Sequence, residues 1–102
     1  MYQLTVLYHP PADVAQFDSY YDQTHTPLAK KVPGLQRLTV TRPKPGPDGL
    51  QPAYHLIAAL EFADEQAFVT GLSSEEGKAA AADIENFATG GVTMLTGPSS
   101  TP

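Results

Sequence analysis

Hydrophobic residues recur along this chain with two different periods, and the period changes several times. Stretches rich in β-branched, aromatic and other apolar residues, whose side chains divide between two faces, predict strands at residues 2–9, 35–42, 53–62 and 92–96. Apolar residues at helical spacing predict a helix beginning near Asp13 and a second helical region, in two pieces, between Asp64 and Phe87. The predicted order of elements is therefore β-α-β-β-α-β.

The first predicted helix carries an apolar stripe and an internal proline. Asp13 is placed to cap its N-terminus, with Gln16 three residues further on. The stripe consists of Val14, Phe17, Tyr21 and Leu28. Because Pro27 has no backbone N–H, we expect the helix to kink or restart near Thr26, and the Pro-Gly pair at 33–34 should end it.

Turn and capping signals divide the second half of the chain. Residues 43–52 contain four prolines and two glycines, which predicts a loop. Ser73 and Glu76 have the spacing of a capping box and predict the start of the second helical piece. A double glycine at 90–91 should end that helix, and residues 97–102 are expected to form a flexible tail.

This order of elements predicts a single α+β domain over residues 1–96. The expected fold is ferredoxin-like, with a four-stranded antiparallel sheet and helices on one face. The sheet face under the helices would carry Leu4, Val6, Tyr8, Leu38, Val40, Leu56, Leu60 and Phe62. The opposite face would carry Thr5, Leu7, Thr39, Thr41, Ile57, Ala59 and Leu95. That half-apolar face favours an interaction surface over scattered apolar residues, and a symmetric dimer would cover it.

Composition and charge narrow the classes of function. The 102 residues include no cysteine, which excludes disulfides, iron–sulfur clusters and a thiol nucleophile. The net charge of -5 argues against nucleic-acid binding. Apolar runs fall far short of the roughly 20 residues of a membrane helix, and no signal-peptide pattern is present, so we expect a cytoplasmic protein. Nucleotide-binding and HExxH motifs are absent, so no cofactor or metal is expected.

His25 is the candidate catalytic residue of the first helix. At about 100° per residue it lies about 40° from Tyr21, with Asp18 and Asp22 on its other side. An imidazole at the edge of a buried stripe and beside a carboxylate suits proton transfer near neutral pH. Asp22 or Asp18 would then orient it. The alternative is a structural histidine that is satisfied by a local hydrogen bond near the proline.

A cavity between the helices and the sheet would hold a substrate. Its expected lining includes Tyr8, Phe17, Tyr21 and Leu56. Tyr54 is expected to face the helices, either as a second acid–base group or as core packing, while His55 faces the open sheet surface. A hydrophobic pocket with few polar groups suits a small aromatic or oxygenated molecule, and it would serve an enzyme or a binding protein equally well.

Three stretches of the chain resemble the EthD family. They are Phe17-Asp18-x-Tyr20-Tyr21-x-x-x-His25-x-Pro27-Leu28 with Lys31-Val32-Pro33-Gly34-Leu35, then Tyr54-His55-Leu56-Ile57-Ala58, and Asp83-x-x-Asn86-Phe87. The resemblance runs over roughly residues 2–96 and implies that the ferredoxin-like monomer pairs into a dimeric α+β barrel. It also matches His25 to a first-helix histidine that lines the cavity of several relatives. Asn86 matches a family motif, where it would bind substrate or end the helix.

The resemblance also implies a class of activity. The family is named for a protein required alongside a cytochrome P450 system in ethyl tert-butyl ether degradation, and members are often labelled oxidoreductases. Relatives with this barrel include cofactor-free monooxygenases, polyketide cyclases and a muconolactone methylisomerase. We therefore expect a homodimeric, cofactor-independent oxidoreductase or isomerase-type enzyme acting on a small hydrophobic substrate. The alternatives are a non-catalytic auxiliary protein that supports a partner oxygenase, and a haem-degrading barrel, which a Soret shift on adding haem would favour.

Overall fold

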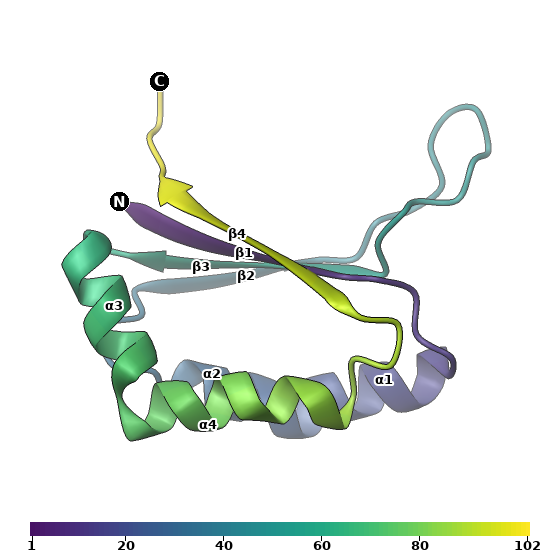
Figure 1. The fold of residues 1–102 in the computed structure, drawn as a ribbon. Coiled ribbons are helices and arrows are strands. Elements are labelled where there is room, and N and C mark those ends of the chain that lie inside the picture. The colour runs from purple at the N-terminus through teal and green to yellow at the C-terminus, as the bar shows by residue number, and fades with distance from the viewer.

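An antiparallel sheet and a layer of helices on one of its faces make up the fold, which the computed structural model describes for all of residues 1–102 (Figure 1). The strands are β1 (Tyr2–Tyr8), β2 (Arg37–Thr41), β3 (Leu56–Phe62) and β4 (Val92–Pro98). All neighbours are antiparallel, in the order β2-β3-β1-β4. The helical elements are α1 (Val14–Tyr20), the π-helical turn η1 (Tyr21–His25), α2 (Thr26–Lys30), α3 (Glu65–Ser73), α4 (Glu75–Asp83) and the 3₁₀ turn η2 (Ile84–Asn86). The predicted ferredoxin-like α+β fold is confirmed.

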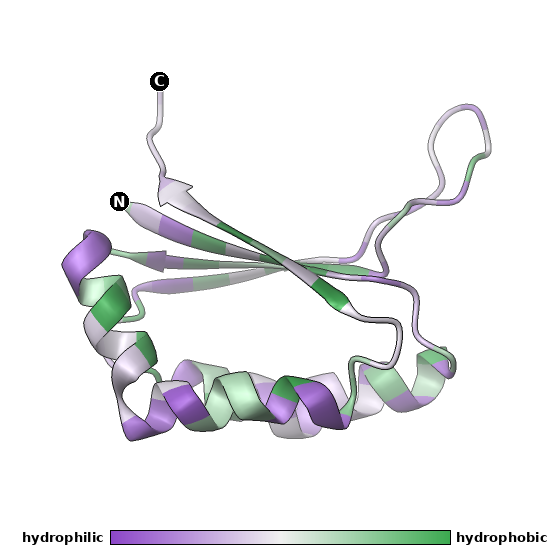
Figure 2. Ribbon diagram, viewed as in Figure 1, coloured by the Kyte–Doolittle hydropathy of each residue, from purple (hydrophilic) through white to green (hydrophobic).

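The two central strands bury every second side chain under the helices. Leu4 of β1 pairs with Leu60 of β3, and Tyr8 pairs with Leu56. All four side chains are buried. Because successive side chains of a strand point to opposite faces, this alternation fixes which face of the sheet the helices cover. Figure 2 shows hydrophilic residues between hydrophobic ones along the strands, although Leu56–Leu60 of β3 form an unbroken hydrophobic run.

Local hydrogen bonds set where the helices begin. Asp13 caps α1, as predicted, and Asp64 caps α3. Each side chain accepts a hydrogen bond from the backbone N–H three residues further on. Ser74, and not Ser73, caps α4, because its hydroxyl oxygen accepts the N–H of Gly77 at 3.0 Å. The predicted capping box is one residue out of register because α3 continues through Ser73 before the chain turns.

The last strand runs two residues further than the sequence predicts. Tyr2 at the start of β1 pairs with Pro98, and the N–H of Ser99 donates to the carbonyl oxygen of Met1 at 2.9 Å. Proline is tolerated at this position because β4 is an edge strand. Residues 97 and 98 therefore belong to the sheet and not to the tail.

The sheet face opposite the helices has no covering layer (Figure 1). The molecule measures 40 × 35 × 18 Å, and the shortest dimension is that of one sheet with one layer of helices. Only 17 of the 102 residues are buried, and Leu95 on the uncovered face is 57% exposed. The long loop between β2 and β3 projects on this same side of the sheet.

No helix of the fold has both the length and the apolar character needed to cross a membrane.

The α3–α4 junction has no room for a side chain at Gly77. A Cβ atom there would lie 2.1 Å from the carbonyl oxygen of Gly71. We expect Gly77→Ala to lower the free energy of unfolding by about 2–3 kcal/mol, although alanine is the better helix former by about 1 kcal/mol. Chemical denaturation measures the change. Lys78→Ala, at the exposed neighbouring position, should change it by less than about 0.5 kcal/mol, and a Gly77→Ala protein as stable as the wild type would contradict this packing.

Candidate functional site

A cavity lies between the helix-facing side of the sheet and the helices. The cavity has a volume of about 80 Å³. Fourteen of its fifteen lining residues are hydrophobic, and the other is His25. Each of the four strands contributes to its wall, for example through Tyr8, Leu38, Ala58 and Met94, and the helical elements contribute Tyr21, Ala29, Leu72 and Ala80. Such a wall suits a small apolar ligand with few polar atoms.

The π-helical turn η1 brings His25 to this wall. In a regular α-helix the ring of Pro27 would clash with the carbonyl group four residues earlier. Here the N–H of Thr26 instead donates to the carbonyl oxygen of Tyr21, five residues earlier, and the wider turn relieves that clash. His25 is 5% exposed, and its ring centroid lies 5.4 Å from that of Tyr21. The helix restart predicted near Thr26 takes the form of a π-helical turn, and His25 is the last residue of that turn.

Asp83, at the end of α4, is the carboxylate partner of His25. The His25 Nδ1 atom lies 3.0 Å from Asp83 Oδ2, and both side chains are buried. A neutral imidazole donates from the nitrogen that faces a carboxylate, so we assign the proton to Nδ1 from this hydrogen bond. Nε2 is then the ring nitrogen that can accept a proton or a hydrogen bond from a ligand.

Three hydrogen bonds keep the Asp83 carboxylate ionised. Tyr20 Oη donates to Asp83 Oδ1 at 2.5 Å and Asn86 Nδ2 donates to the same oxygen at 3.0 Å, in addition to the His25 contact. Burial alone would raise the pKa of Asp83, but these hydrogen bonds outweigh it and hold the pKa below its ordinary value. Burial lowers the pKa of His25 by more than the Asp83 carboxylate raises it. At neutral pH the pair is therefore an aspartate anion and a neutral imidazole.

Tyr8 and Tyr21 supply two phenol groups to the cavity lining. Their ring centroids lie 5.7 Å apart in a nearly perpendicular arrangement. Burial raises the pKa of Tyr8, and it raises the pKa of Tyr21 to about 12. Both side chains therefore remain protonated at neutral pH and can donate a hydrogen bond. The structure brings these two predicted lining residues together with His25.

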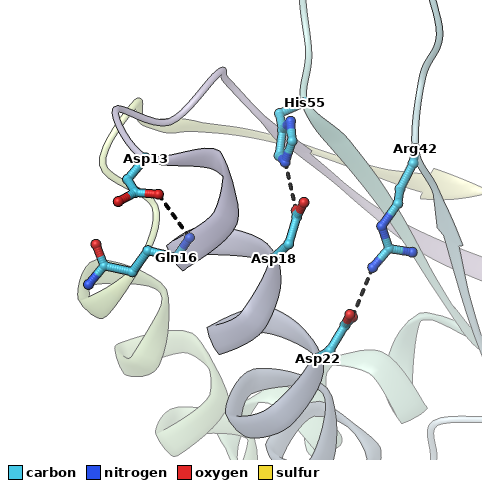
Figure 3. Close-up of polar contacts among 6 residues, drawn as sticks. All are labelled: Asp13, Gln16, Asp18, Asp22, Arg42 and His55. Atoms are coloured by element: carbon cyan, nitrogen blue, oxygen red, sulfur yellow. Dashed lines mark hydrogen bonds and ion pairs between the residues drawn. The ribbon is translucent and has the colours of Figure 1, made fainter.

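Neither carboxylate predicted to orient His25 contacts it. Asp22 is exposed, and its Oδ1 accepts from Arg42 Nη2 at 2.8 Å (Figure 3). Asp18 Oδ1 lies 2.8 Å from His55 Nε2 (Figure 3). The two aspartates lie one turn apart on the side of α1 and η1 that faces the two ends of the β2–β3 loop. Asp83 is instead the carboxylate that contacts His25.

Tyr54 does not line the cavity. Its ring packs against that of His9, with 5.1 Å between the centroids. The chain bends before β3 begins at Leu56, so the side chain of His55 points toward α1 (Figure 3). There it packs against Phe17 with 5.0 Å between the ring centroids. The prediction that His55 faces the uncovered sheet surface is wrong, because strand alternation does not extend through this bend.

The other predicted binding residues do not line the cavity. Phe17 and Leu56 are buried in the core, but neither forms part of the cavity wall. Asn86 is exposed and contacts Asp83 through its side-chain amide. Asp83 and Tyr20 were not assigned a role from the sequence, and the only signal for them was their place in the family motifs. The spacing of residues along one helix could not identify Asp83 as the partner of His25, because the two residues are 58 positions apart in the sequence.

The sheet order, the single helix layer and the apolar cavity between the layers define a ferredoxin-like α+β protein. The sequence profile of the EthD domain matches residues 9–91. The chain belongs to the EthD family, as the resemblance predicted. It is 40% identical over 95 residues to the "Uncharacterized 11.0 kDa protein in thcB-thcC intergenic region" of Rhodococcus erythropolis, covering 93% of this chain and 91% of that protein.

Solved structures show the same architecture. An EthD family protein from Bacillus halodurans superposes with a TM-score of 0.92 at 33% identity, covering 98% of this chain and 99% of the other. A variant of SnoaB, a cofactor-independent oxygenase from Streptomyces nogalater, superposes with a TM-score of 0.69 at 18% identity, covering 99% of this chain and 94% of the other. This second likeness is one of fold alone.

Proposed function

We propose that this protein binds a small, largely apolar molecule in the cavity and that His25 transfers a proton to or from it. The observation that carries the proposal is the position of His25 as the one non-hydrophobic residue of the lining. Its Nδ1 is held by Asp83, which leaves Nε2 to act on a ligand. A neutral imidazole with a carboxylate behind it is a general-base arrangement.

Proton removal from carbon is the step that isomerisation and cofactor-free oxygenation share. In an isomerisation, the carbanion takes a proton back at another carbon. In an oxygenation, it gives electrons to molecular oxygen, which becomes bonded to the carbon. The site therefore supports a cofactor-independent oxidoreductase or an isomerase-type enzyme, and SnoaB, of the same fold, is a cofactor-independent oxygenase.

A comparison of phenol with toluene tests the binding part of this proposal. The two molecules have nearly the same size, but only phenol can donate a hydrogen bond to His25 Nε2. We expect the wild-type protein to bind phenol about 5- to 10-fold more tightly than toluene, the effect of one hydrogen bond of about 1 kcal/mol. In His25→Phe phenol should lose this advantage, because its hydroxyl group is then buried without the imidazole acceptor. NMR titration of backbone amides measures both affinities.

The matched control for this test is His55→Phe. It makes the same chemical change at a histidine that does not line the cavity, so phenol should keep its advantage over toluene. Equal binding of the two molecules to the wild-type protein would contradict a ligand-facing His25. Loss of the advantage in both variants would point to a general change in the fold.

An auxiliary role without turnover is supported by a different observation. The two other residues predicted for acid–base chemistry, Asp22 and Tyr54, both lie outside the cavity. A site with a single proton-transferring side chain would hold a hydrophobic molecule for a partner oxygenase without changing it. The exchange experiment described below separates this role from catalysis.

We further propose that the protein is a homodimer that pairs through the uncovered sheet face. That face carries Leu7 and Ile57 on the central strands and the exposed Leu95 on β4. A second copy would bury these side chains and add a third and fourth layer to a molecule 18 Å thick. The cavity lies on the other side of the sheet, so each subunit would keep a complete site.

A further inference from the structure

Tyr20 lies outside the cavity, yet it contacts the carboxylate that holds His25. Its hydroxyl donates to Asp83 Oδ1 at 2.5 Å, a short, charge-assisted hydrogen bond. Asn86 donates to the same oxygen. Both residues line a separate, more polar hollow, formed by α1 with the two residues before it and by residues 86–89 at the end of η2 and beyond. A continuous set of contacts therefore joins this outer hollow to the imidazole in the cavity.

Aromatic packing holds the Tyr20 ring in place. Phe87 is 5% exposed and lies against both rings, with its centroid 5.4 Å from that of Tyr20 and 4.7 Å from that of His25. The Tyr20 and Phe87 rings are stacked, 26° from parallel. The hydroxyl therefore reaches Asp83 from a ring whose orientation is fixed by packing, and such support keeps a site in one geometry.

We propose that Tyr20 is a positioning residue for His25, which it controls through Asp83. The inference rests on the proposed acid–base role of His25 for its functional meaning. By donating to Oδ1, Tyr20 fixes the plane of the carboxylate, so that Oδ2 faces Nδ1. It also draws charge from the carboxylate, which weakens the attraction between that carboxylate and a protonated imidazole. Tyr20 thereby keeps His25 neutral, and able to accept a proton, at a lower pH than Asp83 alone would allow.

The surroundings of His25 make this effect measurable. The titratable side chains around it are Asp83 from α4, Tyr21 from its own turn and Tyr8 from β1. The pKa values of both tyrosines are raised by burial, so Asp83 is the only one of the three that is charged at neutral pH. A change in the proton affinity of His25 therefore reports on the Asp83 carboxylate.

The test is an NMR pH titration of the His25 imidazole in ligand-free protein. Tyr20→Phe keeps the ring that packs on Phe87 and removes only the hydroxyl. We expect this variant to raise the pKa of His25 by about 0.5–1 unit while Nδ1 keeps its proton. Asn86→Ala removes the other donor and should shift the pKa in the same direction by less, because Asn86 is exposed.

Tyr54→Phe is the matched control, because Tyr54 is the tyrosine that packs on His9 outside this network. It should leave the His25 titration unchanged. An unchanged His25 pKa in Tyr20→Phe overturns the inference, and so does a loss of stability without a shift in that pKa, since Tyr20 would then be purely structural. If the shift appears but phenol and toluene bind equally, the proposed function fails and the positioning role of Tyr20 stands.

Discussion

His25→Phe should slow the exchange of the α-hydrogens of cyclohexanone for deuterium by about 100-fold or more, because a positioned general base contributes about 10²- to 10⁴-fold. Cyclohexanone is a small apolar ring with acidic C–H bonds beside one carbonyl group. Nε2 of His25 takes an α-proton, which leaves an enolate and an imidazolium. The imidazolium exchanges its proton with D₂O and returns a deuteron to the carbon, and mass spectrometry of the ketone measures the rate.

His55→Phe should exchange cyclohexanone at the wild-type rate, because His55 is bonded to Asp18 and lies outside the cavity. The His25→Phe protein should remain folded, since the new ring can still pack against Tyr21 and Phe87. If the wild-type protein is no faster than His25→Phe while phenol is still preferred over toluene, the site binds without catalysing. That outcome would favour the auxiliary role over the enzyme.

The exchange rate should also fall at low pH. Only the neutral imidazole can accept a proton, and burial lowers the pKa of His25 below its ordinary value of about 6.5. We therefore expect the rate to be level around neutral pH and to fall at acidic pH, as the pH drops through the lowered pKa. An inflection above pH 7 would mean that the attraction of Asp83 outweighs burial.

The strands could be predicted from the sequence because their side chains obey a strict local rule. Every second residue is buried in β3, and in β1 from Leu4 onward, so the covered and uncovered faces follow directly from the pattern. The position of His25 at the edge of the buried helix face could also be predicted, because it follows from the spacing of neighbouring residues and from the nearby Pro27. Tyr54 and His55 show where the rule ends: the chain bends just before Leu56, and alternation assigns a face only within a regular strand.

The carboxylate partner of His25 could not be predicted in the same way. Helical phase compares residues on one helix, so Asp18 and Asp22 were the only carboxylates that the argument could consider. The actual partner comes from α4, and its approach depends on how that helix packs beside η1. The two expected partners are instead bonded to His55 and Arg42, at the ends of a loop whose path no local rule determines.

Ile57→Lys should leave the protein folded but raise the dissociation constant of the dimer by about 100-fold or more. Ile57 lies on the uncovered face of the central strand β3, opposite Leu7 on β1 and Thr41 on β2. In a symmetric dimer one substitution places two ammonium groups in the same interface, and removing each from water costs several kcal/mol. Sedimentation equilibrium over a dilution series measures the dissociation constant.

Val69→Lys is the matched control, because Val69 is 53% exposed on α3, on the helix side of the sheet. It should leave the dimer unchanged, whereas a wild-type protein that is monomeric at micromolar concentration would contradict the pairing. The Ile57→Lys monomer has a second use. The cavity and the uncovered face lie on opposite sides of the sheet, so the monomer should still prefer phenol over toluene. Loss of that preference would show that the His25 site depends on the second subunit.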